Sequence, residues 1–257
     1  MKLLALGDVV GTAGCDFVRE KLPQVKRFYG IDVCIANGEN SAAGNGILPS
    51  SAEHLFTSGV DLITTGNHTF KRGEIQDYIE ENEFILRPYN MHSSCPGRGT
   101  GVIDMGRYKV GVINLIGSAY FNSNYGNPFD YLDKAVDELS DCRIKVVDFH
   151  AEATGEKGAL GMYSDGRVSV FFGTHTHVQT ADAKILPKGT GFITDLGMCG
   201  AEYSVLGVSS ENVINALKTG MPTRFTPAQG EMIMDGCIFE IDEKTGMTVS
   251  VNPIRVR

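Results

Sequence analysis

The chain lacks long hydrophobic runs and paired cysteine motifs. No apolar stretch approaches the roughly 20 residues that a membrane-spanning helix needs, so we expect no membrane segment. The apolar start at residues 2–6 stops at Gly7, short of the roughly 7–15 residues of a signal-peptide core, and is predicted to be a strand. The six cysteines are dispersed without C-x-x-C or zinc-ribbon spacing, which predicts reduced thiols and a cytoplasmic protein.

Basic residues are also scarce relative to acidic ones. The chain has 23 Lys and Arg against 31 Asp and Glu, which gives a formal net charge of −8. A field of that sign repels polyanions and offers duplex nucleic acid no basic surface. A small phosphorylated substrate is still compatible, because a metal ion at the site outweighs distant carboxylates that salt screens over about 10 Å.

The composition is that of a globular protein. The chain has 257 residues, of which 42% are hydrophobic, enough to form a sizeable core. Its 31 glycines and 9 prolines follow no period, and no linker, repeat or low-complexity segment interrupts the chain. We therefore expect a single domain over residues 1–257.

Short apolar runs alternate with amphipathic stretches over the first two-thirds of the chain. This alternation predicts an α/β layered fold. The predicted strands are residues 3–6, 32–36, 61–64, 109–115, 145–149, 169–172 and 192–196. The predicted helices are residues 16–28, 50–57, 73–82 and 209–218, and a hairpin is predicted for 231–241 with 247–256.

Polar side chains follow the ends of five predicted strands. They are Asp8; Asn37, Glu39 and Asn40; Asn67 and His68; His150 and Glu152; and His175 and His177. Because the carboxyl ends of parallel strands converge on one crevice, we expect these side chains to face one another. His175 and His177 are two residues apart on an extended segment and therefore point to the same side.

These residues combine imidazoles, carboxylates and side-chain amides. Mixed nitrogen and oxygen ligands suit Mn, Fe or Zn and not a thiolate site. The set is too large for one four-coordinate zinc ion, so we predict two metal ions roughly 3.5–4 Å apart, which would clamp both oxygens of an in-line displacement at phosphorus. Glu39 is the expected bridging carboxylate.

Simpler interpretations exist for several of these residues taken alone. Asp8 suits a turn or helix cap, and Asn37 suits a turn, so we place Asn37 behind the ligands and not among them. Glu152 and Lys157 are interpreted as part of a solvated segment and are placed outside the site. The aromatic loop 118–127 opens toward the same crevice and is suited either to stacking on a nucleobase or, more commonly, to packing.

The order of these blocks resembles that of the calcineurin-like metallophosphoesterases. The matching blocks are residues 7–8, 37–40, 66–68, 150 and 173–177, and the likeness spans essentially the whole chain. Segments 149–154 and 173–182 are most similar to the YmdB-like subfamily. The resemblance implies a four-layer α/β/β/α sandwich with a binuclear metal centre at the strand ends.

The resemblance also implies a role for each site residue. The implied ligands are Asp8 and His177 for one metal ion, Asn67, His150 and His175 for the second, and Glu39 as the bridge. The superfamily motif D-x-H is incomplete, because Val10 stands where its histidine would be. The subfamily fills this place with the amide of Asn40, a neutral ligand that favours iron or manganese over zinc.

The activity implied by the resemblance is that of a phosphodiesterase acting on cyclic nucleotides, chiefly 2′,3′-cyclic ones, with 3′,5′-cyclic ones as a further class. A hydroxide bridging the two metals would attack in line, and His68 would act as general acid or stabilise the leaving oxygen. Two alternatives stay open: a phosphomonoesterase or nucleotidase with the same centre, and a nucleotide- or RNA-responsive regulator. A homo-oligomer formed through loop 219–227 also stays open.

Overall fold

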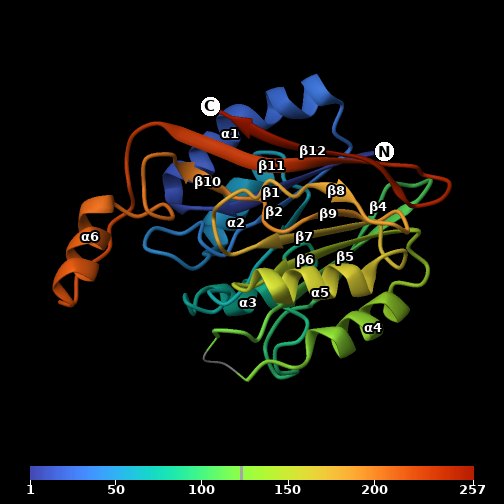
Figure 1. Ribbon diagram of the computed structural model, residues 1–257, viewed down its shortest axis with the longest axis horizontal. Coiled ribbons are helices and arrows are strands. Elements are labelled where there is room, and N and C mark those ends of the chain that lie inside the picture. The colour runs from blue at the N-terminus through green and yellow to red at the C-terminus, as the bar shows by residue number, and fades with distance from the viewer. Residues whose placement is uncertain (122–123) are drawn as a thin grey trace.

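The computed structural model describes residues 1–121 and 124–257, so residues 122 and 123 of the aromatic loop lie outside the described residues. The strands form two six-stranded sheets that pack face to face, with helices on the outer faces (Figure 1). This arrangement confirms the predicted α/β/β/α sandwich. None of the described helices is both long and apolar enough to cross a bilayer.

The first sheet has a parallel half and an antiparallel half. Its strands, in order, are β12 (Thr248–Val256), β11 (Met232–Ile241), β10 (Met198–Ala201), β1 (Lys2–Val9), β2 (Val33–Asn37) and β3 (Leu62–Thr64). Strands β10, β1, β2 and β3 run parallel, so their carboxyl ends share one edge of the sheet. The β11–β12 hairpin closes the other side and pairs antiparallel with both β1 and β10.

The second sheet is parallel in its centre and antiparallel at both edges. Its strands, in order, are β4 (Thr100–Asp104), β5 (Lys109–Ile116), β6 (Ile144–His150), β7 (Val170–Thr174), β9 (Gly191–Ile193) and β8 (Lys184–Ile185). Strands β5, β6, β7 and β9 are parallel, and β4 and β8 pair antiparallel at the edges.

Three hydrophobic clusters fill the three gaps between the four layers. The helices on the first sheet are α1 (Gly11–Tyr29), α2 (Pro49–Thr57) and α3 (Ile75–Glu81), and those on the second are α4 (Pro128–Glu138) and α5 (Thr154–Ser164). The alternation along β1 shows why the layers form: Leu3 and Ala5 face the other sheet, while Leu4 and Leu6 face the helices. Each inner strand is thus buried on both faces.

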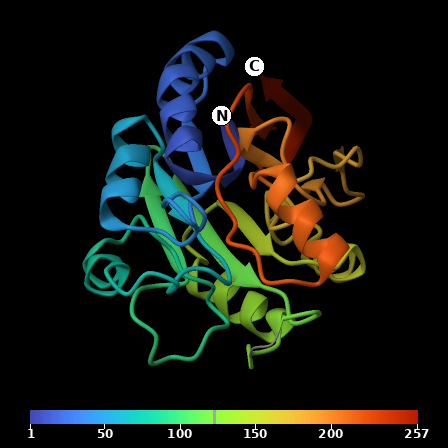
Figure 2. The ribbon, with the colours of Figure 1, turned by 90° about the vertical axis from the view of Figure 1, so that its left-hand side faces the viewer.

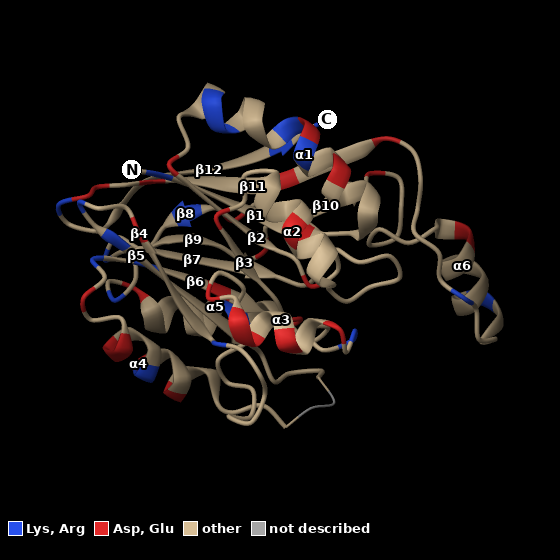
Figure 3. Cartoon of the chain, turned by 180° about the vertical axis from the view of Figure 1, so that it is seen from behind, with Lys and Arg blue, Asp and Glu red and all other residues tan. Residues whose placement is uncertain are grey.

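Segment 151–157 differs from its interpretation as solvated. Residues 154–164 form α5, and the side chain of Lys157 is fully buried, so the interpretation is wrong for this residue. Figure 3 shows that charged residues otherwise belong mainly to the outer helices and the connecting loops. Burial also raises the pKa of the Cys15 and Cys237 thiols to about 12, which fits the prediction that these cysteines pack in the core and do not react.

Helix α6 (Ser210–Thr219) stands apart from the layers. It lies in the long connection between β10 and β11 and projects from one end of the molecule (Figures 1 and 2). None of its residues is buried. The connection that carries α6 returns to the body at Ala228, whose N–H donates to the carbonyl of Gly207 at 2.9 Å. Both ends of this connection therefore meet beside the carboxyl end of β1.

Candidate metal centre

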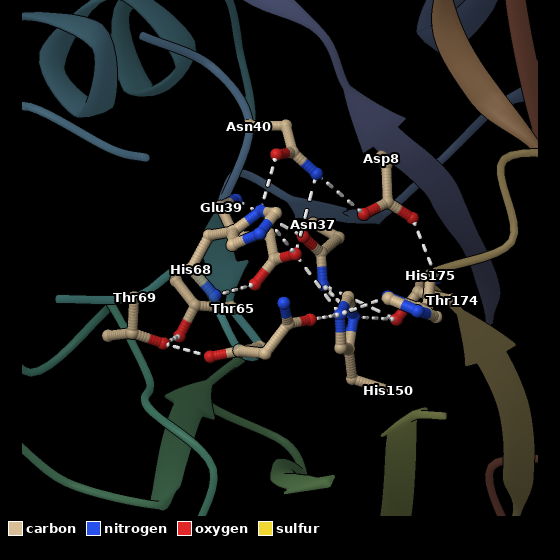
Figure 4. A network of polar contacts seen from close by, with 12 residues as sticks. Asp8, Asn37, Glu39, Asn40, Thr65, His68, Thr69, His150, Thr174 and His175 are labelled. Atoms are coloured by element: carbon tan, nitrogen blue, oxygen red, sulfur yellow. Dashed lines mark hydrogen bonds and ion pairs between the residues drawn. The ribbon is translucent and has the colours of Figure 1, made fainter. Parts of the chain in front are cut away.

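The residues predicted to form the site meet at the carboxyl ends of parallel strands from both sheets (Figure 4). They are Asp8 near the end of β1, Glu39 and Asn40 after β2, Asn67 and His68 after β3, His150 at the end of β6, and His175 and His177 after β7. The site therefore straddles the two sheets and does not lie on the edge of one.

His150 is at the centre of one half of the site. Its Nε2 atom lies 3.1 Å from Glu39 Oε1, 2.9 Å from Asn67 Oδ1 and 3.1 Å from His175 Nδ1. Ligand atoms of Glu39, His150 and His175 all lie within 4.8 Å of one another. The structure thus brings together the residues that the sequence predicts for the second metal ion and the bridge.

The tautomer of His150 follows from its neighbours. The Thr174 hydroxyl donates to Asp148 Oδ1 at 2.8 Å, so its oxygen accepts from Nδ1–H of His150 at 2.9 Å. In its neutral form the ring therefore presents an unprotonated Nε2 to the acceptor oxygens of Asn67 and Glu39. Several acceptors facing one another fit a cation between them. Burial lowers the pKa of His150, but Glu39 raises it to about 9, so protons and metal ions compete for Nε2.

The other two imidazoles are oriented in the same way. His175 Nε2 lies 3.1 Å from Glu152 Oε2, so it donates there and leaves Nδ1 free toward the cluster. His177 Nδ1 donates to the carbonyl of Leu206 at 3.1 Å and leaves Nε2 free, 3.5 Å from Asp8 Oδ1. Glu152, placed outside the site by the sequence, thus orients a predicted ligand from a half-exposed position.

The loop that carries these histidines has a strained backbone. His175 and His177 have φ values of 102° and 61°, a region that non-glycine residues rarely occupy. Two buried carboxylates hold the loop: Asp8 Oδ2 accepts from the His175 N–H at 3.0 Å, and Asp195 Oδ2 accepts from the Thr176 N–H at 3.1 Å. The strain is therefore offset by contacts that aim both rings at the cluster.

Asp8 and Glu39 are buried carboxylates with little neutralising charge around them. Burial raises their pKa values, but His177 beside Asp8 and His150 beside Glu39 outweigh it and hold both pKa values below the usual range. In the part of the chain that the structure describes, no Lys or Arg side chain forms an ion pair or hydrogen bond with either carboxylate. These two anionic side chains would stabilise a metal cation placed between them and the imidazoles.

Asn40 joins the two halves of the site. Its Nδ2 lies 3.4 Å from Asp8 Oδ1 and 3.3 Å from His177 Nε2, while its Oδ1 lies 3.0 Å from His68 Nδ1. The nitrogen of this amide therefore faces Asp8, and ligation of a metal through the oxygen requires a half-turn of the amide. Its role as a ligand stays a prediction.

Further polar residues behind the ligands were not predicted from the sequence. Asp148 is buried, which raises its pKa to about 6, and accepts from the hydroxyls of Thr64 and Thr174. Asn37 Nδ2 donates to Asp148 and Thr174 at 3.3 Å, so it lies behind the ligands as expected. The available signal for Asp148 is its place two residues before His150, on the same face of β6.

An aromatic ring and a cavity border the cluster. The ring of Phe121 lies 5.1 Å from that of His175, so this residue of the aromatic loop packs against a predicted ligand. A cavity of about 370 Å³ opens beside His68, Glu39 and His177. This cavity lies next to the predicted ligands and is within the usual size of small-ligand sites.

Comparison with known proteins identifies the family. The family model described as "YmdB-like protein" matches residues 4–254. The chain belongs to the YmdB-like family. It is 42% identical over 257 residues to the 2′,3′-cyclic-nucleotide 2′-phosphodiesterase of Bacillus subtilis, a match that covers 100% of this chain and 97% of that protein.

Solved structures agree with the YmdB-like assignment. The crystal structure of a novel phosphatase from Mycoplasma pneumoniae superimposes with a TM-score of 0.94 at 36% identity, covering 100% of this chain and 93% of that one. A 5′-nucleotidase precursor from Thermus thermophilus, at 14% identity and a TM-score of 0.60, covers 100% of this chain and 54% of that one and supports the fold alone. The resemblance found in the sequence is thus confirmed: this YmdB-like chain belongs to an enzyme family that includes a phosphodiesterase.

Gly66 leaves the space that His150 occupies in this YmdB-like site. A Cβ atom at residue 66 would lie 2.2 Å from His150 Cδ2 and 2.4 Å from its Nε2. We expect the added methyl group in Gly66→Ala to displace the ring of His150. Catalytic activity should fall about 100-fold, which is the effect expected of a 1 Å misplacement. The metal content, measured by elemental analysis, should fall as well. Gly73→Ala is the control, since a Cβ there meets no atom within 4 Å. Normal metal content in Gly66→Ala would contradict the expectation.

Proposed function

We propose that this chain is a metal-dependent phosphodiesterase that hydrolyses cyclic nucleotides, chiefly 2′,3′-cyclic ones, at a centre of two metal ions. The observation that carries the proposal is the convergence of nitrogen atoms from three imidazole rings and two buried carboxylates beside a cavity. The name of the Bacillus subtilis relative supports the substrate class.

The donor atoms divide between two positions. In the proposal, Asp8 and His177 would hold one ion, and Asn67, His150 and His175 would hold the other, with Glu39 shared between them. Asn40, in the orientation of this structure, would orient His68 through its side-chain oxygen. Nitrogen and oxygen donors without thiolate fit iron or manganese, with zinc as a further option. When bound, the two ions would supply Lewis acidity and lower the pKa of a water molecule between them.

The protein's own part of the reaction is to orient the phosphodiester and to move a proton. His68 Nδ1 faces the carbonyl oxygen of the Asn40 side chain at 3.0 Å and donates to it, which leaves Nε2 for the substrate. The backbone N–H of His68 donates to Glu39 Oε2 at 2.8 Å and fixes the ring beside the cluster. We propose that Nε2, once protonated, gives its proton to the leaving oxygen. Burial lowers the pKa of His68, so that proton is readily released.

A phosphomonoesterase is the second candidate, supported by the relative described as a novel phosphatase. The two are distinguished by measuring metal content and the hydrolysis of 2′,3′-cyclic AMP and of 3′-AMP on one sample purified without chelator. Two metal equivalents with release of 3′-AMP support the phosphodiesterase. Turnover of the monoester alone supports the second candidate, and an absence of metal with Glu39 and His177 intact contradicts both.

His68→Ala tests the proton donor. We expect kcat for 2′,3′-cyclic AMP to fall about 10²–10⁴-fold, because the alkoxide leaving group needs a proton. The loss should be far smaller for bis(p-nitrophenyl) phosphate, whose leaving group is a weak base, and metal content should not change. His92→Ala, at an exposed histidine, is the control. Equal losses on both substrates would contradict the role in proton transfer.

A further inference from the structure

The cavity beside the metal cluster has an apolar side that the proposed hydrolysis does not use. Leu206, Val208, Phe225 and Pro227 line it, and all four belong to the connection between β10 and β11 that carries α6. Phe225 and Leu206 are 53% and 47% exposed. Large apolar side chains left open beside polar catalytic groups are typical of a ligand-binding surface.

Hydrogen bonds hold this apolar side in place next to the cluster. The Ser209 N–H donates to the carbonyl of Thr226 at 2.9 Å, and the Thr226 hydroxyl donates to Asn212 Oδ1 at 2.6 Å. Thr226, the residue after Phe225, is therefore held through both its carbonyl and its side chain. The carbonyl of Leu206 accepts from His177 Nδ1 at 3.1 Å. The apolar side is thus attached directly to a residue predicted to bind metal.

We propose that this side of the cavity is a nucleobase subsite. The base stacks on the ring of Phe225 between Leu206 and Val208. A cavity of about 370 Å³ is within the usual size of small-ligand sites. This inference rests on the proposed function, because it needs the phosphate of the same molecule at the cluster.

Phe225, and not Phe121, is therefore the aromatic platform. The ring of Phe121 lies 6.5 Å from that of His150 and 5.1 Å from that of His175, so it packs on the imidazoles. Among the described residues that line the cavity, Phe225 is the aromatic side chain apart from the histidines. This assignment moves base recognition from the loop that follows β5 to the connection that follows β10.

The test uses three esters that share one scissile ring: 2′,3′-cyclic CMP, 2′,3′-cyclic UMP and the base-free methyl ribofuranoside 2′,3′-cyclic phosphate. We expect Phe225→Ala to raise KM about tenfold for the two nucleotides, with kcat within about threefold and no change on the base-free ester. Leu217→Ala, which removes a more exposed apolar side chain from α6, should change nothing.

The outcomes separate this inference from the proposed function. Hydrolysis of all three esters with no effect of Phe225→Ala would overturn the subsite and leave the phosphodiesterase standing. Hydrolysis of none of them would contradict the phosphodiesterase. In that case, calorimetric titration with cytidine 3′-monophosphate decides: binding that Phe225→Ala weakens and Leu217→Ala does not supports the subsite, and equal binding to all three proteins overturns it.

Discussion

Glu39→Gln is expected to abolish binding of at least one metal ion and to lower phosphodiesterase activity by more than about 10³-fold, since the metals supply several kcal/mol of transition-state stabilisation. Glu39 Oε1 lies 3.1 Å from His150 Nε2, and Oε2 accepts from the His68 N–H at 2.8 Å. Glutamine keeps the shape of the side chain but removes the negative charge, and its amide places a donor where the site needs an acceptor.

Elemental analysis and thermal unfolding with and without added manganese provide the measurement. In the wild-type protein we expect the metal to raise Tm, because it would bind the folded chain and not the unfolded one; in Glu39→Gln this increase should be lost. Glu81→Gln removes the same charge from the exposed end of α3 and should behave as wild type. Two metal equivalents and full activity in Glu39→Gln would remove Glu39 from the bridging position.

The site could be predicted from the sequence because its residues occupy repeated local positions. A short apolar strand buried on both faces is recognisable by its run of residues such as Leu3 to Leu6, and the polar residue that follows it stands out. Parallel pairing then brings these strand ends together, so Asp8, Glu39 and His150 meet although they are far apart in the chain. The chemistry of the donor set follows from residue type alone.

Elements whose formation depends on tertiary contacts were not predicted. Strand β10 is four residues of mixed type, yet it pairs in parallel with the end of β1. It is stabilised by close approach of backbones: a Cβ at Gly14 of α1 would lie 2.4 Å from the carbonyl oxygen of Cys199. Helix α5 carries few periodic apolar residues and three glycines, so its amphipathic pattern is weak. In both cases the decisive neighbours come from distant segments.

Residues that orient the ligands were missed for the same reason. Glu152 and Thr174 act through hydrogen bonds to His175 and His150, and the local sequence around each has no sign of its partner. A carboxylate or hydroxyl acquires such a role only from the distance and direction of the group that it faces. Lys157 is the extreme case, since lysine is rarely buried and the sequence around it is polar.

Lys157 and Asp195 form an ion pair that is fully buried behind the loop of His175 and His177. Lys157 Nζ lies 2.7 Å from Asp195 Oδ2 and donates to the carbonyl of Thr174 at 2.8 Å. Asp195 also accepts from the N–H groups of residues 176 and 197, at 3.1 and 2.9 Å. The pair therefore joins α5, the end of β7 and the segment that leads into β10.

Lys157→Met is expected to lower the free energy of unfolding by about 3–5 kcal/mol, because it leaves the Asp195 carboxylate buried without a countercharge. Urea unfolding measures this change. The same variant should weaken metal binding, since the Thr176 N–H depends on Asp195 and lies between two predicted ligands with strained φ values. Lys218→Met, on the exposed face of α6, should change the free energy of unfolding by less than about 0.5 kcal/mol.

The double variant Lys157→Met with Asp195→Asn separates the charge from the positioning of the loop. Asparagine removes the unpaired anion, so the double variant should regain a large part of the free energy of unfolding lost in Lys157→Met. Its side-chain oxygen accepts fewer hydrogen bonds than the carboxylate, which serves residues 157, 176 and 197 at once, so metal affinity should recover less than stability does. Equal recovery of metal affinity and of the free energy of unfolding would mean that the ion pair affects metal binding only through stability. The backbone of the histidine loop would then be held by Asp8.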